Sequence, residues 1–488
     1  MYPLAAKLSI LFLLGLACLN AASEQPNIVL IMADDHGRWA TGTYGDSRIR
    51  TPNMDQLAAE GVRFDAAISP APVCSPSRAS FFTGRIPSQH GVHDFLSEDE
   101  PFDKKGRLDG ETLLSEKLKK AGYKTGLFGK WHADGEGWKP VRGFDKWLSY
   151  DLRAMDWITQ YAHSGTVHYS VDGEAVSKTG MQAWFLTESA LEFIDSAEGA
   201  PFFTCLTYVE PHFPFEGLPE RTVSYYRDFA SELLPYGDNS WTNRSNKKTG
   251  DTPQHEEWVA QYLAAVTLLD EQIGRLQDGL QARGLLENTI IIYVSDHGHM
   301  TGQYGLYGKA NGSLPLNLTE ETLSIPLIIS GPREWIRPAQ VRSEFVNLCD
   351  LHETIVDLAG SDETPKGPGK ALTPLLQGER VREWRQRQFA EYGNARMISD
   401  GRWKLVRYYA EDPASAPVDH WFDLSNPRKE RVPSIGPHQE AKEDFVSQLE
   451  TYFTRWEEPG KSGRQVWSLP RFNAGEPWTK EPLPISSN

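Results

Sequence analysis

The sequence predicts an α/β protein with a large, mostly parallel central sheet sandwiched by helices, and with a smaller C-terminal antiparallel α+β subdomain. Continuous apolar runs such as residues 26–33 and 289–295 are typical of strands that are buried on both faces. Amphipathic helical stretches alternate with these runs, which indicates helix layers on both sides of one sheet. With 488 residues, the chain is long enough for one large domain and a smaller one.

Helix and strand signals alternate through the first half of the chain. Residues 53–61 predict a short helix, with Asn53 as a possible cap and Gly61 as its end. Residues 133–180 are rich in Trp, Gly, Tyr and Asp and lack periodicity, so they are expected to form loop and small strands. The other elements expected here are strands over 62–68, 123–128 and 201–209 and helices over 111–122 and 181–197.

The second half continues this alternation of helices and strands, and its last part then changes to short antiparallel strands. After a polar, turn-rich stretch over 217–251, residues 255–283 carry one apolar stripe, which predicts a long helix. A segment over 360–378, rich in Gly, Pro, Lys and Glu, is the expected boundary between a first domain, residues 24–375, and a C-terminal subdomain, residues 376–488. The remaining expected elements are strands over 289–295 and 323–330, a helix over 345–360, short antiparallel strands over 387–392, 395–398, 403–409 and 421–424, and a helix over 441–456.

The N-terminus has the pattern of a signal peptide over residues 1–23. Lys7 supplies a positive charge, residues 9–19 are apolar, and residues 21–23 offer small side chains for cleavage. The apolar run is too short to span a bilayer, and no later stretch is long and apolar enough to be a transmembrane anchor. Cys18 lies in a poor match to a lipoprotein signal. We therefore expect export, either to a periplasm or out of the cell.

Composition limits the partners and the redox chemistry. The formal net charge is −16 and no long run of Lys or Arg occurs, which argues against a nucleic-acid partner. An anionic substrate would therefore need positive charge concentrated in its site. Of the four cysteines, Cys205 and Cys349 both lie in apolar runs, where two buried thiols and a disulfide are equally compatible with the sequence.

Four of the predicted apolar strands end in polar residues of the types that catalyse reactions. In open α/β sheets, ligands bind beyond the carboxyl ends of the strands, so we expect these side chains to gather at one sheet edge. Adjacent carboxylates at such an edge need a cation or hydrogen-bond donors. Hard oxygen donors suit Ca²⁺ or Mg²⁺. The strands are followed by Asp34 and Asp35, by Lys130 and His132, by His212, and by Asp296 and His297.

A single stretch, residues 70–85, contains the most distinctive pattern in the chain. Its core is Cys74-Ser75-Pro76-Ser77-Arg78, followed by an apolar run and by Thr83-Gly84-Arg85. Pro76 is favourable near a helix start, so Cys74 is expected at the N-terminus of a helix, where free N–H groups attract an anion. Arg78, one turn on, adds a fork of donors suited to an oxyanion. The stretch indicates a site for a tetrahedral anion beside a modified or nucleophilic cysteine.

The Cys-x-Pro-x-Arg pattern followed by Thr-Gly-Arg resembles the signature of the type I sulfatases, which have the alkaline phosphatase-like fold. The resemblance covers roughly residues 27–332 and, more loosely, the C-terminal part. It implies that a formylglycine-generating enzyme oxidises Cys74 to formylglycine (3-oxoalanine). It also implies one calcium ion, with formylglycine from Cys74 completing a ligand shell in which the family often has Asn where His297 stands. The implied metal ligands are Asp34, Asp35, Asp296, His297 and residue 74.

The resemblance also assigns the remaining site residues. In the family's mechanism, one hydroxyl of hydrated formylglycine attacks sulfur and displaces an alcohol. A base then takes the proton of the second hydroxyl, and sulfate leaves. His132 is suited as that base, while His212 or Lys309 should protonate the leaving alcohol. Asn311 lies in the loop after Lys309 and is a candidate substrate contact. The matching catalytic residues are Cys74, Arg78, Lys130, His132, His212 and Lys309.

The expected substrate is a sulfated carbohydrate from a polysaccharide, attacked from its end. Export places the enzyme where polymers are met, and the aromatic-rich segments 131–157 and 213–241 could cover apolar sugar faces or simply pack the loops. One alternative is a phosphodiesterase or phosphonate monoester hydrolase of the same fold. The other is a non-catalytic binder of sulfated glycans whose Cys74 is never converted.

Overall fold

The computed structural model describes residues 25–96, 108–134, 137–151, 153, 157–235, 237–244, 252–426, 429–469 and 478. The expected signal peptide, residues 1–23, lies outside them. Within the described ranges, none of the helices combines the length and the apolar character that a membrane crossing requires.

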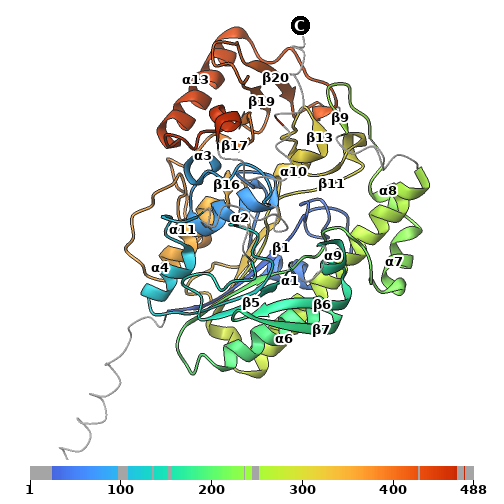
Figure 1. Cartoon of the computed structure of the whole chain (residues 1–488), viewed down its shortest axis with the longest axis vertical. Coiled ribbons are helices and arrows are strands. Elements are labelled where there is room, and N and C mark those ends of the chain that lie inside the picture. Colours follow the sequence, from blue (N-terminus) through green and yellow to red (C-terminus); the bar gives the residue numbers. More distant parts are fainter. Residues whose placement is uncertain are drawn as a thin grey trace, which may run out of the picture.

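A ten-stranded sheet forms the centre of the molecule (Figure 1). Its strands are β1 (Asn27–Ala33), β2 (Val62–Phe64), β4 (Lys124–Gly129), β5 (Lys146–Tyr150), β6 (Ser164–Val171), β7 (Glu174–Met181), β8 (Phe202–Thr207), β10 (Thr289–Ser295), β14 (Leu327–Ser330) and β15 (Gln340–Arg342). They are ordered β15-β2-β14-β10-β1-β8-β4-β5-β6-β7. The five central strands, β10 to β5, are parallel, whereas β14, β6 and β7 run antiparallel to their neighbours. The predicted α/β class is confirmed, with a parallel centre inside a mixed sheet.

Strand β1 is buried on both faces because the sheet lies between two helix layers. Ile28 and Leu30 point into a core shared with one helix layer, while Val29 and Ile31 point into the core of the opposite layer. This alternation explains why the strand reads as one unbroken apolar run. The first layer contains α2 (Cys74–Thr83), α4 (Leu114–Lys120) and α11 (Leu348–Leu358), and the second contains α1 (Pro52–Glu60), α6 (Gln182–Asp195) and α9 (Thr252–Ala282).

The C-terminal part forms its own antiparallel sheet, drawn in orange to red in Figure 1. Its strands are β17 (Gln388–Tyr392), β18 (Ala395–Ser399), β19 (Trp403–Tyr408) and β20 (Val418–Asp423), in that order, and α13 (Gln439–Trp456) packs on them. The predicted antiparallel subdomain is thus confirmed. The boundary between residues 375 and 376 stays a prediction, because one apolar core joins Tyr392 and Met397 to Ile68 and Leu316 of the first part.

Three expected elements differ from the structure. The strand expected over 62–68 is two strands, since β3 (Ala67–Ile68) leaves the main sheet and pairs with β16 (Val346–Asn347). Asn53 does not cap α1: the capping position is Thr51, and the Asn53 amide instead donates to the Asp270 carboxylate at 2.8 Å. The strand expected over 323–330 begins only at Leu327, after α10 (Glu320–Leu323).

The largest difference concerns residues 133–180, which were expected to form loop and small strands outside the central sheet's regular pattern of apolar runs. Strands β5, β6 and β7 instead extend the central sheet, and β6 pairs with β7 along eight residues each. Strand β7 is almost wholly exposed, so it carries no apolar alternation by which the sequence could reveal it. The stretch over 217–251 likewise contains α7 (Glu220–Arg227) and α8 (Ala230–Leu233). The short remaining elements are α3 (Pro87–His90), α5 (Trp157–Gln160), α12 (Thr373–Leu376), β9 (Asn243–Arg244), β11 (Met300–Thr301), β12 (Tyr307–Gly308) and β13 (Ser313–Leu314).

Candidate active site

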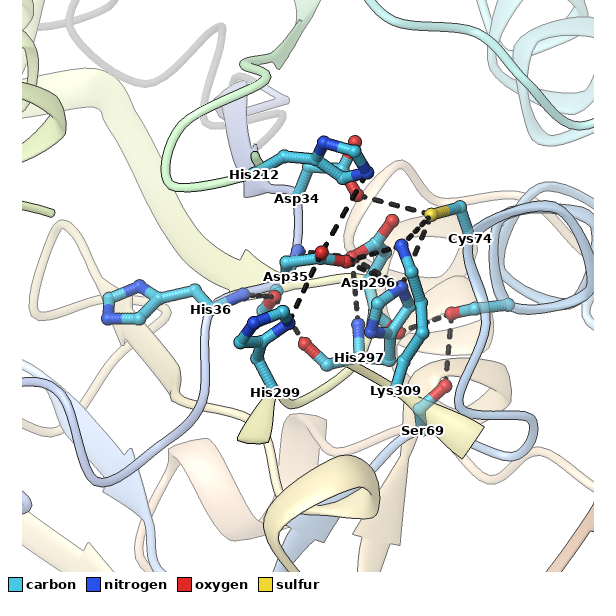
Figure 2. Close-up of polar contacts among 12 residues, drawn as sticks. Asp34, Asp35, His36, Ser69, Cys74, His212, Asp296, His297, His299 and Lys309 are labelled. Atoms are coloured by element: carbon cyan, nitrogen blue, oxygen red, sulfur yellow. Dashed lines mark hydrogen bonds and ion pairs between the residues drawn. The ribbon is translucent and has the colours of Figure 1, made fainter. Parts of the chain in front are cut away.

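The carboxyl ends of four neighbouring parallel strands meet at one edge of the sheet. Strands β10, β1, β8 and β4 are adjacent in this order, and all three pairings are parallel. The polar residues that follow them therefore converge, as Figure 2 shows for the side chains after β1, β8 and β10. They are Asp34 and Asp35 after β1, Lys130 and His132 after β4, His212 after β8, and Asp296 and His297 after β10.

Cys74 is the first residue of α2 and lies at the centre of this edge. Its side chain is buried, and its Sγ is 3.3 Å from the nearer Asp34 carboxylate oxygen, 3.3 Å from His297 Nε2 and 2.8 Å from Lys309 Nζ. The helix begins at the expected residue and ends at Gly84, which adopts the left-handed conformation (φ 72°) that favours glycine.

The surroundings of Cys74 favour a negative charge. Burial alone would raise the pKa of its thiol, but the nearby Lys130, Lys309 and His297 outweigh burial and hold the pKa well below its ordinary value. The same cations, with the free N–H groups at the start of α2, can stabilise an anionic group that replaces or extends this side chain.

Three buried carboxylates give the site the character of a cation-binding centre. Asp34, Asp35 and Asp296 are all at most 2 % exposed. Ligand atoms of Asp34, Cys74, Asp296 and His297 lie within 4.8 Å of one another, and so do those of Asp34, Asp35, Cys74 and His212. Burial and the neighbouring Asp34 raise the pKa of Asp296 to about 6, so a cation close to Asp296 would favour its ionised form. This oxygen-rich donor set fits a hard divalent ion.

Three basic side chains neutralise the carboxylates from the other side. Lys130 forms an ion pair with Asp34, Lys309 Nζ lies 2.6 Å from Asp35 Oδ1, and Arg78 Nε lies 2.9 Å from Asp296 Oδ2. Burial would lower the pKa of both lysines, but their carboxylate partners raise it above the ordinary value, so both stay protonated. A strongly acidic chain thus concentrates positive charge in one site.

The two candidate acid–base histidines occupy different surroundings. His132 Nε2 donates to the Leu96 carbonyl oxygen at 2.7 Å, which leaves Nδ1 as the nitrogen with the lone pair. Burial lowers the pKa of His132, so its imidazole is neutral and able to accept a proton. His212 is partly exposed, and its Nε2 lies 3.8 Å from Asp35 Oδ2. One histidine is therefore inside the site and the other lies at its entrance.

The site contains two residues that the sequence did not identify. His299 Nδ1 lies 3.2 Å from Asp35 Oδ2, and its position two residues after His297 was the signal that could have revealed it. The Tyr161 ring lies 5.7 Å from the His212 ring and 4.8 Å from Lys130 Nζ. Tyr161 belongs to the aperiodic segment, where no pattern marks it.

Asn311 and the remaining cysteines can also be placed. Asn311 lies half-buried in a 3₁₀ turn, Ala310–Gly312, which directly follows Lys309. Cys205 and Cys349 are both buried free thiols, so the structure decides the alternative that the sequence left open in favour of two unpaired cysteines.

The chain is similar to known proteins along most of its length. Residues 26–361 match the family model described as Sulfatase, and residues 302–453 match the one described as N-sulphoglucosamine sulphohydrolase, C-terminal. The chain is 27% identical over 516 residues to an N-acetylglucosamine-6-O-sulfatase of Bacteroides thetaiotaomicron. This alignment covers 87% of this chain and 86% of the relative.

Two solved structures illustrate the breadth of this fold. One, in complex with its substrate D-glucosamine-2-N,6-O-disulfate, superposes with a TM-score of 0.74 at 22% identity and covers 89% of this chain and 98% of the other. A phosphonate monoester hydrolase from Silicibacter pomeroyi superposes with a TM-score of 0.65 at 21% identity, covering 88% and 96%. At these identities the structures establish a common fold.

Proposed function

Because this chain belongs to the sulfatase family and is a sulfuric ester hydrolase, we propose that it removes sulfate from carbohydrates derived from sulfated polysaccharides. The observation that carries the proposal is the position of Cys74 at the start of α2, enclosed by Lys130 and Lys309 and by the carboxylates of two adjacent strand ends. The glucosamine sulfate substrates named for similar proteins support the carbohydrate class. The N-terminal signal pattern supports export to a periplasm or out of the cell.

Two groups would complete the site. Formylglycine made from Cys74 by a formylglycine-generating enzyme would supply, as its hydrate, one hydroxyl that attacks sulfur and a second whose deprotonation releases sulfate. Asp34, Asp35, Asp296 and His297, with residue 74, would hold Ca²⁺, which would neutralise oxygen charge there. The buried carboxylates and their short separations fit such an ion.

The chain's own residues would neutralise charge, transfer protons and contact the substrate. Lys130 and Arg78 are positioned to neutralise the sulfate oxygens, since both stay charged in the buried site. His132, neutral and oriented by the Leu96 carbonyl, takes a proton from residue 74. When the S–O bond to the alcohol breaks, the alcohol oxygen receives a proton either from His212 at the entrance or from Lys309 beside residue 74. Asn311 is a candidate contact to the substrate.

The first test concerns the state of Cys74. The protein should be made in a host that has the converting enzyme, and the peptide that contains residue 74 should be weighed by mass spectrometry. We expect formylglycine in active protein, and we expect Cys74→Ala to abolish turnover while the thermal transition stays in place. Full activity in protein with an unmodified thiol would contradict the proposal, and an unconverted, inactive wild type would favour the non-catalytic glycan binder.

The second test concerns the metal. Asp34→Asn removes a charged oxygen ligand and should remove bound calcium and activity together, as measured by elemental analysis and by sulfate release. Asp46→Asn, at a partly exposed carboxylate that pairs with Arg48, is the matched control and should keep both bound calcium and activity. Fully active wild-type protein without a divalent ion would refute the metal assignment.

A phosphonate monoester hydrolase is the second candidate, because proteins of that activity share the fold. Sulfated sugars and an aryl phosphonate monoester should be offered to the same preparation. We expect kcat/KM to favour the sulfate ester, and a reversed preference would support the second candidate.

A further inference from the structure

A cluster of aromatic rings runs from the active site to the surface. At its inner end, the Tyr262 hydroxyl donates to the Asp35 carbonyl oxygen at 2.7 Å, and the Tyr262 ring stacks on His299 at 5.3 Å. The Phe215 ring meets Tyr262 at 6.4 Å and Trp258 at 6.0 Å. The inner rings are therefore fixed against the backbone of a proposed metal ligand.

The outer end of this cluster consists of Phe213, Trp258 and Tyr307, here called the outer rings. Phe213 stacks on Trp258 with centroids 5.6 Å apart and ring planes 24° apart, and Tyr307 meets Trp258 edge-on at 5.4 Å. Phe213 is 37% exposed, while Trp258 and Tyr307 are half-buried. Within the described part of the chain, Phe213 is one of five large apolar side chains that are exposed, so its ring is accessible to a ligand.

The outer rings come from the same segments as the groups that face the leaving alcohol. Phe213 directly follows His212, and Tyr307 precedes Lys309 by two residues. Because the leaving oxygen must reach His212 or Lys309 for its proton, the sugar attached to that oxygen extends outward from these two residues. Phe213 and Tyr307 therefore offer apolar ring surface within two residues of these groups along the chain.

We propose that the outer rings form a binding site for the saccharide leaving group, with the apolar C–H face of a pyranose lying against Phe213 and Trp258. This inference rests on the proposed function and adds a substrate-binding site to it. Flat rings present a broad apolar surface at low entropic cost, and the C–H face of a sugar is the part of a carbohydrate that such a surface can desolvate. Tyr307 would border the site, held by its hydroxyl, which lies 2.9 Å from His255 Nδ1.

The test compares binding of the sugar with binding of sulfate alone. Phe213→Ala and Trp258→Ala should each lower kcat/KM for a sulfated saccharide about tenfold, the size expected for loss of one aromatic contact. Inorganic sulfate binds the charged centre without a sugar, so its inhibition constant should change less than about twofold in these variants. Phe213→Tyr keeps a ring and should restore most of the activity, whereas Phe213→Leu keeps apolar volume without a flat face and should not.

Trp184 provides the matched control. It is a 48% exposed tryptophan on α6, and its neighbour is Arg275 rather than the aromatic cluster. Trp184→Ala should leave both kcat/KM for the sulfated saccharide and the inhibition constant of inorganic sulfate unchanged. If Phe213→Leu were as active as wild type, or if the sulfate inhibition constant rose in parallel with the loss on saccharides, the rings would only pack the site and the inference would be overturned. Wild-type protein that hydrolyses a phosphonate monoester but no sulfated saccharide would overturn the proposed function as well.

Discussion

Tyr161 shows how a single ring can organise two charged groups of the site. Its ring meets His212 edge-on at an interplanar angle of 81°, while Lys130 Nζ lies over its face. The electron-rich face of an aromatic ring attracts an ammonium group, and its flank fixes the plane of the imidazole. Neither of these two contacts involves a proposed metal ligand, so we regard Tyr161 as a positioning residue.

This role predicts a dependence on the leaving group. Tyr161→Leu removes the ring and should lower kcat/KM for sulfated sugars about tenfold, because poor leaving groups need an oriented acid. The loss should be smaller with an activated aryl sulfate, and His212→Ala should give the same pattern more strongly. Tyr161→Phe keeps the ring and should behave like wild type. Equal losses of Tyr161→Leu on both substrate classes would contradict a role that acts through His212.

At the scale of elements, a buried ionic cluster joins the C-terminal subdomain to the first domain. Lys404 of β19 is fully buried, and its Nζ lies 2.9 Å from Glu320 of α10 and 2.8 Å from Glu430. Glu430 belongs to a 3₁₀ turn, Lys429–Arg431, and it also accepts a hydrogen bond from the Glu320 backbone N–H at 2.7 Å. Burial, together with the nearby Glu320 and Glu321, raises the pKa of Glu430 to about 7 despite Lys404.

The raised pKa predicts how stability changes with pH. The folded protein binds a proton at Glu430 more tightly than the unfolded chain, whose pKa is near 4.5. The group's contribution to stability is therefore fully present below pH 4.5 and is lost as the pH rises through about 7. Glu430→Gln stays neutral, so its melting temperature should fall less than that of wild type between about pH 5.5 and pH 8. This can be followed by scanning calorimetry.

The control for this prediction is Glu443→Gln, at an exposed position on α13. Its melting temperature should follow that of wild type across the same pH range. A Glu430→Gln protein whose pH dependence parallels wild type would show that Glu430 does not change its protonation on folding.

At the scale of the whole molecule, the two parts share one apolar core and several direct hydrogen bonds. Tyr392 and Met397 of the C-terminal sheet pack with Ile68 and Leu316. The Tyr408 hydroxyl donates to the Leu316 carbonyl oxygen at 2.8 Å, and the Glu391 N–H donates to the Pro70 carbonyl oxygen at 3.0 Å. Pro70 lies only four residues before Cys74, so the subdomain supports the start of α2.

This arrangement predicts that a chain ending at residue 375 cannot form a native active site. Removal of residues 376–488 would expose the apolar residues of the shared core and release the segment before α2. We expect such a protein to bind hydrophobic dyes, to lack a cooperative thermal transition and to hydrolyse no sulfate ester. A soluble, cooperatively unfolding and active fragment would instead support two independent domains.

The sequence predicted what depends on burial and local chemistry, and missed what depends on tertiary pairing. Strand β10 was predicted residue for residue, since burial on both faces leaves an unbroken apolar run. The start of α2 was marked by Cys74 and Pro76, and the strand ends by adjacent carboxylates. Strand β7 was missed because its exposed side chains follow no period. The contacts of Tyr161 join it to Lys130, which follows β4, and to His212, which follows β8, and both are distant from it in the sequence.

The burial of Cys74 has a kinetic consequence. In the folded chain this side chain is 2% exposed, and every residue of α2 is buried, so no second protein can reach it. The proposed conversion must therefore finish before the helix packs, in competition with folding itself. A host that folds the chain faster than it oxidises the thiol would accumulate two populations with the same fold: active protein with formylglycine at position 74, and inactive protein with the unmodified cysteine. Specific activity would then measure the ratio of two rates during biosynthesis, and heating or refolding a finished sample would not restore the missing fraction.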